Sequence, residues 1–392
     1  MENIEETAVV IVGAGPAGLA VSACLSLKSI PYILLEKEDC VAPLWKKHAY
    51  DRLHLHLAKN YCFLPFKPHS PSTPTYLSKD EFIQYIDDYV SDFDIKPRLS
   101  CCVECALYLE DERNWNILVK NYASNGIEIY RAQFLVIASG ENAKGFIPEI
   151  EGLSEFKGQV IHSSEYKSGL EFHGKNVLVI GCGNSGMELA YDLANYGART
   201  SIVIRSPFHV VSRELIRLGM FLLKYFPINV VDSLVTFGAK TMFGDLSKYG
   251  IHRPKEGPFF LKATKGRSPV IDVGTVSKIK TREIKVLPAV SSIKEDIVVF
   301  ENGQRQAFDA IILATGFRST ACDWLEDYCY VLNDQGFPKN RYPLHWKGEK
   351  GVYCVGLSKM GLFGVSSDAE QTANDIAKLL HAETDNSKGK YN

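Results

Sequence analysis

Short apolar runs near the start of the chain predict a strand, a helix and a second strand in close succession. Ala8 to Val12 and Tyr32 to Leu35 are uninterrupted apolar stretches, as is typical of strands buried on both faces of a parallel sheet. Between them, Leu19 to Leu27 is apolar over a length that suits a helix. The pattern therefore predicts a β-α-β unit at the N-terminus.

The same pattern returns in the middle of the chain. Asn176 to Ile180 and Thr200 to Ile204 read as buried strands, and Met187 to Tyr196 reads as the helix between them. A later apolar strand, Phe308 to Phe317, is preceded by a strand over Ile297 to Phe300 and a hairpin turn at Asn302-Gly303. We therefore predict a second β-α-β domain.

Alternating apolar and polar positions predict antiparallel strands between the two units. They cover Cys101 to Leu109, Trp115 to Asn121 and Ile127 to Arg131, and a buried strand, Phe134 to Ala138, follows. Near the C-terminus, Gly351 to Gly356 reads as a strand. Ser367-x-x-Glu370 reads as a capping box that opens a helix over Asp368 to Leu380.

These elements predict an α/β fold with two dinucleotide-binding domains, each built on a parallel Rossmann-like sheet, and a small inserted antiparallel meander. The expected division is a flavin-type domain in two parts, 1–168 and 306–392, around a second nucleotide domain, 169–305. Within the second nucleotide domain, Phe208 to Leu261 is an apolar helical region. It either covers the approach of a substrate or fills a core.

Composition narrows the class of protein. The 392 residues are 46% hydrophobic and 23% charged, which is ordinary for a soluble globular protein. A net charge of -2 gives no reason to expect nucleic acid or an anionic membrane as a partner, and no apolar stretch is long enough to span a membrane. Ten cysteines without framework spacing fit reduced thiols in the cytoplasm.

Each predicted β-α-β unit carries a Gly-x-Gly-x-x-Gly turn between its first strand and its helix. In the first turn, Gly13 permits the bend, Gly15 lets a pyrophosphate approach the backbone, and Gly18 lets the helix pack closely. Pro16 and Ala17 lie within this turn, and a bound pyrophosphate is expected at the N-terminus of the helix that follows. Glu36 ends the second strand, where it can accept hydrogen bonds from ribose hydroxyls.

The second turn differs in the charge at the matching place. Its members are Gly181, Gly183, Asn184, Ser185 and Gly186. The following strand ends at Arg205 and Ser206, where an acid would favour NAD and an arginine favours the 2′-phosphate of NADP. The two turns therefore predict FAD at the first and NADPH at the second.

A stretch between the two turns carries a family resemblance. Phe156, Gly158, His162, Tyr166 and Lys167 form F-x-G-x-x-x-H-x-x-x-Y-K, which resembles the identifying sequence of the flavin-containing monooxygenases. Without that resemblance, the stretch reads as a loop and short strand in which His162 and Tyr166 hold two domains together.

Further segments resemble the plant YUCCA branch of this family. Tyr50-Asp-Arg-Leu-His-Leu-His-Leu57, with Trp45 before it, resembles a run in that branch, and Ala314-Thr315-Gly316 matches the A-T-G motif at a domain crossing. At the first crossing, Ser139 stands in the place of the usual threonine, and Asn142 is either a cofactor contact or a turn residue.

The YUCCA resemblance covers nearly the whole chain and implies a function. NADPH would reduce FAD, and the reduced flavin would capture O2 as a C4a-(hydro)peroxide that oxygenates a small molecule. The substrate implied is indole-3-pyruvate, converted to indole-3-acetate in auxin biosynthesis. Residues implied at the cofactors include Trp45, Asn142, Thr315 and Gly316. No catalytic acid, base or nucleophile is implied.

Three alternatives stay open on the sequence alone. Cys102 and Cys105 have the spacing of a dithiol, which would suit an NADPH-dependent disulfide reductase. S- or N-oxygenation of another small molecule would use the same cofactors, and a binding protein would have lost turnover. Four histidines fall close together (His48, His54, His56 and His69), but they alternate with leucines as in a strand and lack the spacing of a structural zinc site.

Overall fold

The computed structural model describes residues 4–388, which form two compact units. Among these residues, the first unit consists of 4–47, 59–144 and 317–388, and the second of His48–Ala58 and Gly145–Gly316. Apart from the short segment His48–Ala58, the chain changes unit at 144/145 and 316/317, whereas the sequence placed these changes at 168/169 and 305/306. The reason is that strand β7 (Gln159–His162) pairs with β16 (Ala310–Leu313), so the family stretch belongs to the second unit's sheet.

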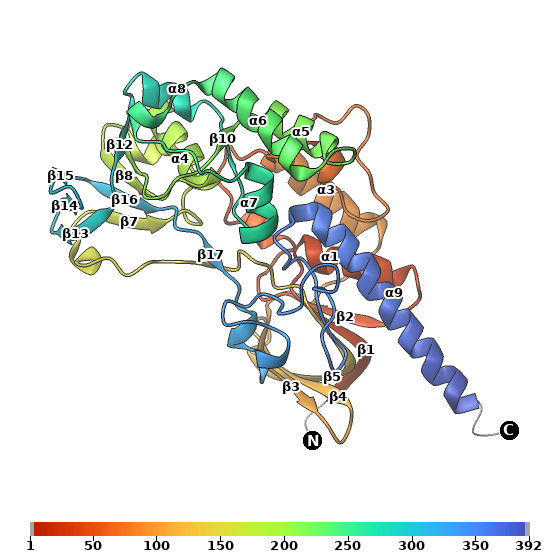
Figure 1. Cartoon of the computed structure of the whole chain (residues 1–392). Coiled ribbons are helices and arrows are strands. Elements are labelled where there is room, and N and C mark those ends of the chain that lie inside the picture. The colour runs from red at the N-terminus through yellow and green to blue at the C-terminus, as the bar shows by residue number, and fades with distance from the viewer. Residues whose placement is uncertain (1–3, 389–392) are drawn as a thin grey trace. The chain divides into compact units, whose positions relative to one another are not determined.

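The first unit is built on one mixed sheet (Figure 1). Its strands are β1 (Ile4–Val12), β2 (Tyr32–Leu35), β3 (Cys101–Leu109), β4 (Asn114–Asn121), β5 (Gly126–Ile137) and β18 (Val352–Cys354). The order is β2-β1-β5-β4-β3, with β18 parallel to β5. β1, β2, β5 and β18 run parallel, whereas β3 and β4 are antiparallel to their neighbours.

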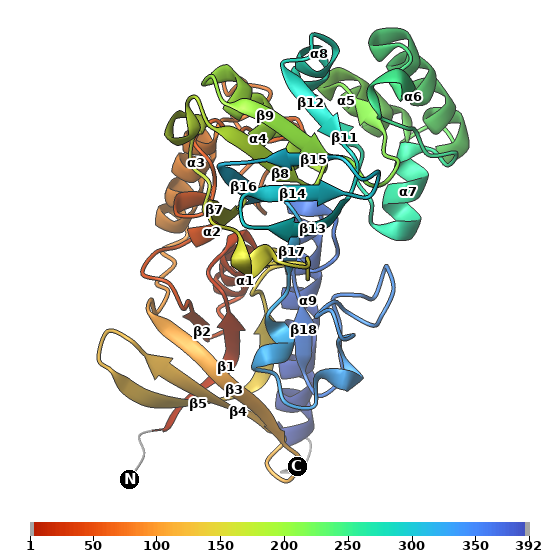
Figure 2. The same cartoon turned by 90° about the vertical axis from the view of Figure 1, so that its left-hand side faces the viewer.

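The predicted antiparallel meander is present as β3, β4 and β5, and it continues the parallel sheet of this unit. Ile127 to Arg131 and Phe134 to Ala138 were expected as two strands, but no turn-forming residue separates them and β5 passes through both. The first part of β5 pairs with β4, and its last residues pair with β18. Figure 2 shows β3, β4 and β5 side by side in this unit.

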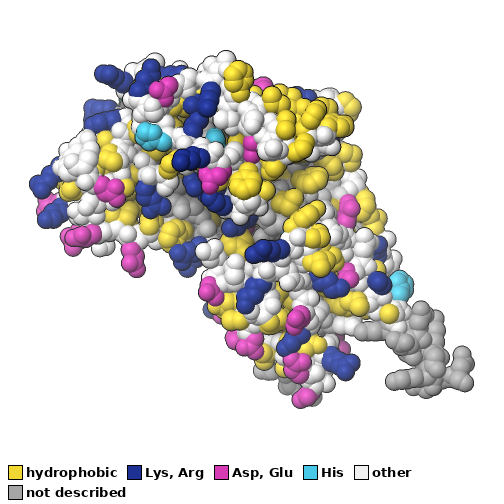
Figure 3. Space-filling model, viewed as in Figure 1, with side chains coloured by type: hydrophobic (Ala, Val, Ile, Leu, Met, Phe, Trp, Pro, Cys, Tyr) yellow, Lys and Arg dark blue, Asp and Glu magenta, His cyan; other side chains and the backbone are white. Residues whose placement is uncertain are grey.

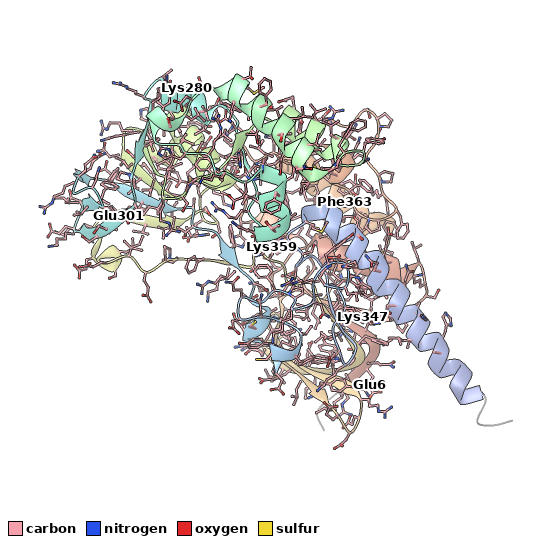
Figure 4. The ribbon with its side chains drawn as sticks, viewed as in Figure 1. Glu6, Lys280, Glu301, Lys347, Lys359 and Phe363 are labelled. Atoms are coloured by element: carbon pink, nitrogen blue, oxygen red, sulfur yellow. The ribbon has the colours of Figure 1, made fainter. Side chains whose placement is uncertain are left out.

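The helices of the first unit are α1 (Pro16–Ser26), α2 (Pro43–Lys46), α3 (Lys79–Asp92) and α9 (Gly361–Lys388), with 3-10 turns at Lys59–Tyr61, Ala321–Asp323 and Tyr328–Tyr330. Helix α3 begins with a capping box in which the Ser78 hydroxyl accepts the Glu81 amide and the Glu81 carboxylate accepts the Ser78 amide. α9 packs along α1. Figure 4 shows Lys347 beside α9, where its Nζ donates to Asp375 over 2.7 Å.

The predicted start of the last helix was wrong. α9 begins at Gly361, so Ser367 and Glu370 lie inside the helix and form no capping box at its N-terminus. The apolar Leu362 and Phe363 continue the helical pattern toward the N-terminus, and the Ser366 hydroxyl donates to the Phe63 carbonyl over 2.7 Å. Figure 4 marks Phe363 near the beginning of this helix.

The second unit contains a parallel sheet of order β12-β9-β8-β16-β7. Its strands not yet given are β8 (Asn176–Ile180), β9 (Arg199–Val203) and β12 (Ile284–Leu287). A separate antiparallel sheet is formed by β13 (Val290–Lys294), β14 (Ile297–Phe300) and β15 (Arg305–Ala307), and β10 (Val210–Val211) pairs with β11 (Val270–Ile271). β6 (Lys144–Gly145) and β17 (Phe317–Arg318) lie where the chain changes unit.

The helices of the second unit are α4 (Asn184–Asn195), α5 (Arg213–Leu222), α6 (Ile228–Phe243), α7 (Pro258–Lys265) and α8 (Thr275–Lys280), with 3-10 turns at Leu153–Glu155, Gly169–Phe172 and Ser247–Tyr249. The core lies between the sheet and these helices, because β8 and β16 are apolar and buried on both faces. Across residues 4–388, no helix is both long enough and apolar enough to cross a membrane.

The segment His48–Ala58 belongs to the second unit, although the sequence placed it in the flavin domain and its His54-Leu55-His56 alternation in a strand. It forms no named strand and is fixed to α4 by charged side chains. His56 Nε2 lies 2.6 Å from Glu188 Oε1, and Arg52 lies 3.7 Å from a carboxylate oxygen of both Glu188 and Asp192. Since both acids are buried, these partners offset the cost of burying their charge.

Candidate nucleotide-binding sites

The three glycines of the first turn differ in their conformation and in the space around them. Gly13 has φ +107°, and a Cβ there would lie 2.6 Å from the Ala138 carbonyl oxygen. A Cβ at Gly18 would lie 1.9 Å from the Gly13 oxygen, so only glycine lets α1 pack this closely on the turn. At Gly15, by contrast, a Cβ would meet nothing within 4 Å. The backbone at Gly15 is therefore open to a ligand.

Helix α1 presents backbone donors at this open glycine. It begins at Pro16, has no side-chain cap, and makes its first hydrogen bond from the Leu19 amide to the Gly15 carbonyl. The amides of the preceding helical residues, Ala17 and Gly18, come before that bond and have no intrahelical acceptor. Such donors and the helix dipole suit a pyrophosphate.

Glu36 lies at the turn, and its carboxylate also accepts hydrogen bonds from two backbone amides of the protein. Oε2 accepts the Ala14 amide over 2.7 Å and Oε1 accepts the Glu38 amide over 3.0 Å. Burial raises the pKa of this carboxyl, and the two amides oppose that effect. Each carboxylate oxygen retains a further lone pair, so Glu36 can still accept a ribose hydroxyl.

Trp45 and Asn142, the other predicted residues of the first unit, differ in how firmly they are held. Trp45 lies on α2, which the Ala42 amide ties to the Ala14 carbonyl over 2.9 Å, and its ring packs on Phe82 with centroids 4.4 Å apart. Asn142 is exposed in the turn after Gly140. Trp45 thus shapes the wall beside the turn, and Asn142 is available to a ligand.

Two features near the first turn escaped the sequence analysis as site residues. The Ser139 hydroxyl is buried without a hydrogen-bond partner within the protein, immediately after β5 and against Gly13. Gly356 follows β18, and a Cβ there would lie 2.9 Å from the Cβ of Ala17. The sequence could have indicated Gly356, because it ends an apolar strand as the glycines of the two turns do. The unsatisfied Ser139 hydroxyl and the open Gly15 both fit a dinucleotide such as FAD.

The second turn repeats the glycine geometry of the first. Gly181 has φ +115°, and a Cβ there would lie 2.3 Å from the Ala314 oxygen. A Cβ at Gly186 would lie 2.0 Å from the Gly181 oxygen, whereas one at Gly183 would meet nothing within 4 Å. Helix α4 begins after Gly183 without a side-chain cap. The second unit therefore has the same opening for a pyrophosphate.

Asn184 and Ser185 begin α4, but Asn184 is used within the protein. Its Oδ1 accepts the Ile271 amide over 2.8 Å, and its Nδ2 donates to the Pro269 carbonyl over 3.3 Å. Asn184 therefore fixes the segment before β11 across the turn. Ser185 is partly exposed beside it.

Arg205 and Ser206 are exposed after β9, and a second arginine lies with them. Arg267 donates from Nη2 to the Pro207 carbonyl over 2.8 Å, which holds its guanidinium on the segment that carries Arg205. Both arginines act electrostatically on Cys182 within the glycine turn and oppose the rise in its thiol pKa that burial causes. The sequence analysis missed Arg267, because it is distant in sequence and only the pairing of β10 with β11 places it here.

Thr315 and Gly316 have the predicted position after β16, and both are hydrogen-bonded within the second unit. The Thr315 hydroxyl donates to the Phe146 carbonyl, and the Gly316 carbonyl accepts the Phe146 amide over 2.9 Å. A Cβ at Gly316, which has φ +92°, would meet nothing within 4 Å. The open backbone at Gly316, more than the Thr315 hydroxyl, is what a ligand could approach.

The His and Tyr of the family stretch are buried and hydrogen-bonded. His162 Nε2 lies 3.0 Å from the Gly316 carbonyl, and a Cβ at Gly145 would lie 2.4 Å from the His162 ring. Burial lowers the pKa of this imidazole. The Tyr166 hydroxyl donates to Asp192 over 2.6 Å. Both contacts are structural and lie within the second unit.

The two cysteines of the disulfide-reductase alternative and the clustered histidines of a possible metal site have ordinary structural surroundings. Cys102 and Cys105 are both free thiols, and burial raises the pKa of each, which opposes thiolate chemistry. Three of the four clustered histidines have separate partners: His54 contacts the Arg52 carbonyl, His56 contacts Glu188, and His69 contacts the Cys62 carbonyl. These residues therefore form neither a reactive dithiol nor a common ligand set.

Two parallel sheets, each with an open glycine turn at the start of a helix, define a protein of the double dinucleotide-binding class. A profile described as flavin-binding monooxygenase-like matches residues 6–365. The chain therefore belongs to the flavin-binding monooxygenase-like family, and it is a flavin-dependent monooxygenase.

Curated relatives agree with this assignment over nearly the whole chain. The probable indole-3-pyruvate monooxygenase YUCCA10 of Arabidopsis thaliana is 54% identical over 376 residues, which are 96% of this chain and 98% of that protein. The indole-3-pyruvate monooxygenase YUCCA6 of the same plant is 45% identical over 379 residues, covering 95% of this chain and 90% of that protein. The disulfide-reductase alternative is thereby set aside.

Solved structures share the fold at low sequence identity. A flavin-containing monooxygenase from Stenotrophomonas maltophilia superposes with a TM-score of 0.72 at 19% identity, covering 96% of this chain and 99% of that one. A structure of OTEMO in complex with FAD and NADP gives a TM-score of 0.75 at 16% identity, covering 97% and 85%. The predicted two-domain flavoprotein fold is confirmed.

Proposed function

We propose that the protein uses NADPH, FAD and O2 to convert indole-3-pyruvate to indole-3-acetate and CO2, the auxin-forming reaction. The observation that carries this proposal is the 54% identity to probable indole-3-pyruvate monooxygenase YUCCA10 across 96% of the chain. The balanced reaction consumes one NADPH, one proton and one O2 for each keto acid and releases NADP+ and water. Bound FAD and NADPH supply the redox chemistry.

The residues of the first unit are assigned to hold FAD. The backbone at Gly15 and the first-turn amides of α1 would face the pyrophosphate, and Glu36 would accept a ribose hydroxyl. Ser139 and Asn142 are the polar side chains offered to the rest of the cofactor. The open space at Gly15 and the unsatisfied Ser139 hydroxyl support this assignment.

The residues of the second unit are assigned to hold NADPH. Gly183 and the start of α4 would face its pyrophosphate, and Arg205 with Arg267 would pair with the 2′-phosphate. Ser206 can donate a hydroxyl to the same phosphate. No side chain is assigned as a catalytic acid, base or nucleophile. The ten free cysteines support a cytoplasmic location.

One assay tests the substrate. Purified protein with FAD, NADPH and O2 receives indole-3-pyruvate or a thioether, and indole-3-acetate, CO2, sulfoxide and NADPH oxidation are measured. We expect indole-3-acetate and CO2 in equal amounts, matched to NADPH consumed. Sulfoxide without indole-3-acetate would overturn the keto-acid assignment and leave both cofactors in place.

A further inference from the structure

Helices α5, α6 and α7 of the second unit expose an unusual amount of large apolar surface. Their inner sides are buried, as at Ile216, Val231 and Val235. The outward side chains of these helices, together with Tyr225 and Phe226 from the connection between α5 and α6, form what we call the apolar face: Leu218, Phe221, Tyr225, Phe226, Val230, Leu234, Phe237, Met242 and Phe260. Tyr225 is 68% exposed and Phe237 is 71% exposed. Figure 3 shows hydrophobic side chains gathered over α5 and α6.

The apolar face follows the helical repeat, so it is a second face of the helices and not a set of scattered exposures. Val230, Leu234 and Phe237 recur at intervals of four and three residues along α6. Leu218 and Phe221 are three residues apart on α5, about one helical turn. Because the opposite faces already pack on the unit's core, the outer stripe finds no partner among these helices. Contiguous exposed apolar surface of this kind marks an interaction site.

The charge of the same segment identifies the kind of partner. Residues 213–265, from the start of α5 to the end of α7, contain nine Lys and Arg but only four Asp and Glu, a formal charge of +5, while the whole chain carries -2. One of the four acids, Asp232, is buried and accepts the Phe259 and Phe260 amides. Lys224 lies one residue from Tyr225, and Lys240 lies three residues from Phe237 on the same helix. Basic side chains therefore accompany the aromatic ones.

We propose that the apolar face docks the protein onto an anionic membrane surface. Phe221, Tyr225 and Phe237 would enter the boundary between headgroups and acyl chains, and Lys224 and Lys240 would lie beside the anionic headgroups. The helices would lie in the plane of the surface, in keeping with the finding that no helix in residues 4–388 could span a membrane.

A second copy of the chain is the less suitable occupant. A symmetric dimer buries the same patch of both subunits, so two segments of charge +5 would face each other. Like charges across an interface cost free energy and slow association. An anionic lipid surface offers apolar depth and opposite charge together. This inference concerns where the enzyme works and does not depend on which substrate it oxidises.

Vesicle flotation with the full-length, FAD-loaded protein tests the proposal. We expect the protein to float with phosphatidylcholine vesicles that contain phosphatidylserine, to float poorly with pure phosphatidylcholine, and to be released as salt is raised. Failure to bind the anionic vesicles, or equal binding to both kinds, would overturn the proposal.

Two paired variants locate the docking surface. Phe221→Ser with Phe237→Ser should lower the partition coefficient at least tenfold, because the anchors for the acyl boundary are removed. Lys224→Gln with Lys240→Gln should lower it about fivefold for each lysine replaced. FAD content and circular dichroism verify that each variant is folded.

Matched controls lie elsewhere on the surface. Tyr122→Ser with Ile127→Ser removes two exposed apolar side chains from the first unit, and Lys294→Gln with Lys378→Gln removes two exposed lysines. Both controls should bind vesicles as the parent protein does, and equal loss in the controls would overturn the proposal. So would a dimer in sedimentation that Phe221→Ser with Phe237→Ser abolishes, since that result would assign the apolar face to self-association.

Discussion

The two glycine turns have the same backbone geometry but differ in the residues that surround them. In both, the first glycine has a positive φ, the third packs against the carbonyl oxygen of the first, and the second is open. At the end of the next strand, however, Glu36 is buried and holds two backbone amides, whereas Arg205 is exposed beside Arg267. The two backbones thus offer the same opening, and we propose that the side chains after the second strand distinguish the nucleotides.

A second difference concerns the hydroxyl-bearing residue after the strand that packs against each turn, which is β5 in the first unit and β16 in the second. After β5, the Ser139 hydroxyl is buried with no partner in the protein, while after β16 the Thr315 hydroxyl is used by the Phe146 carbonyl. An unsatisfied buried hydroxyl carries a free-energy cost that a bound ligand can remove. A ligand bound at the first turn could satisfy the Ser139 hydroxyl, whereas the Thr315 hydroxyl already has a partner within the protein.

The largest effect is expected from adding a methyl group to either open glycine. Gly15→Ala and Gly183→Ala meet no protein atom within 4 Å and have φ values, -74° and -70°, that alanine accepts. The methyl would occupy the pyrophosphate's approach and weaken binding about a hundredfold, or about 3 kcal/mol. FAD content after purification should fall only for Gly15→Ala, and the NADPH KM should rise only for Gly183→Ala.

A control for these variants is Gly126→Ala, at the first residue of β5. It should retain FAD and leave the NADPH KM unchanged. If Gly183→Ala instead lost FAD while Gly15→Ala kept it, the assignment of the two cofactors to the two turns would be reversed.

The next effect concerns the arginines that distinguish the second turn. Arg205→Ala should raise the NADPH KM tenfold or more, about 1.5 to 3 kcal/mol for a charge-assisted pair, while NADH kinetics change little. Arg267→Ala should act in the same direction but less, because its guanidinium also serves the Pro207 carbonyl. Binding of 2′,5′-ADP should weaken in both variants, and binding of 5′-ADP should not.

Arg305→Ala, an exposed arginine on β15, is the control for charge alone. An unchanged preference for NADPH over NADH in Arg205→Ala would remove the basis for the NADPH assignment.

Glu36→Gln tests whether the acid of the first turn is also structural. The amide side chain has one acceptor oxygen in place of two, so the Ala14 or Glu38 amide loses its partner. We expect the free energy of unfolding of FAD-free protein to fall by about 1 to 2 kcal/mol. Chemical denaturation measures it, and an unchanged midpoint would limit Glu36 to ligand binding.

Lowering the pH should change the stability contributions of His162 in the second unit and Glu36 in the first unit in opposite directions, and these effects are smaller. The folded-state pKa of His162 is lowered from 6.5, so its contribution to stability is complete above that value and is lost as pH falls through the folded pKa. The folded-state pKa of Glu36 is raised from 4.5, so its contribution is greatest below that value and declines as pH rises through the folded pKa.

The stability difference between the parent protein and His162→Gln should therefore narrow as pH falls from about 7.5 toward the lowered pKa, by less than about 1 kcal/mol. The difference for Glu36→Gln should widen as pH falls toward 4.5. Thermal unfolding across this pH range measures both. If the stability differences of the two variants changed with pH in the same direction, the opposite pKa shifts assigned to His162 and Glu36 would be contradicted.

The sequence by itself determined the features that depend on neighbouring residues. The glycine turns, their flanking strands and helices, and the contrast between Glu36 and Arg205 are local patterns, because a tight turn, a strand and a helix N-terminus are each fixed by residues adjacent in the chain. The predicted strands Tyr32–Leu35, Cys101–Leu109, Asn176–Ile180 and Ile297–Phe300 have the same bounds in the structure. FAD and NADPH followed from these patterns.

Only the tertiary structure decided what depends on residues far apart in sequence. It attached His48–Ala58 to the second unit through Glu188 and Asp192, and it brought Arg267 to the segment that carries Arg205. Helical periodicity alone could not say which side of α6 would be buried, since both sides are apolar. Long-range packing selects one face for the core, and the apolar face that remains is a consequence of that selection.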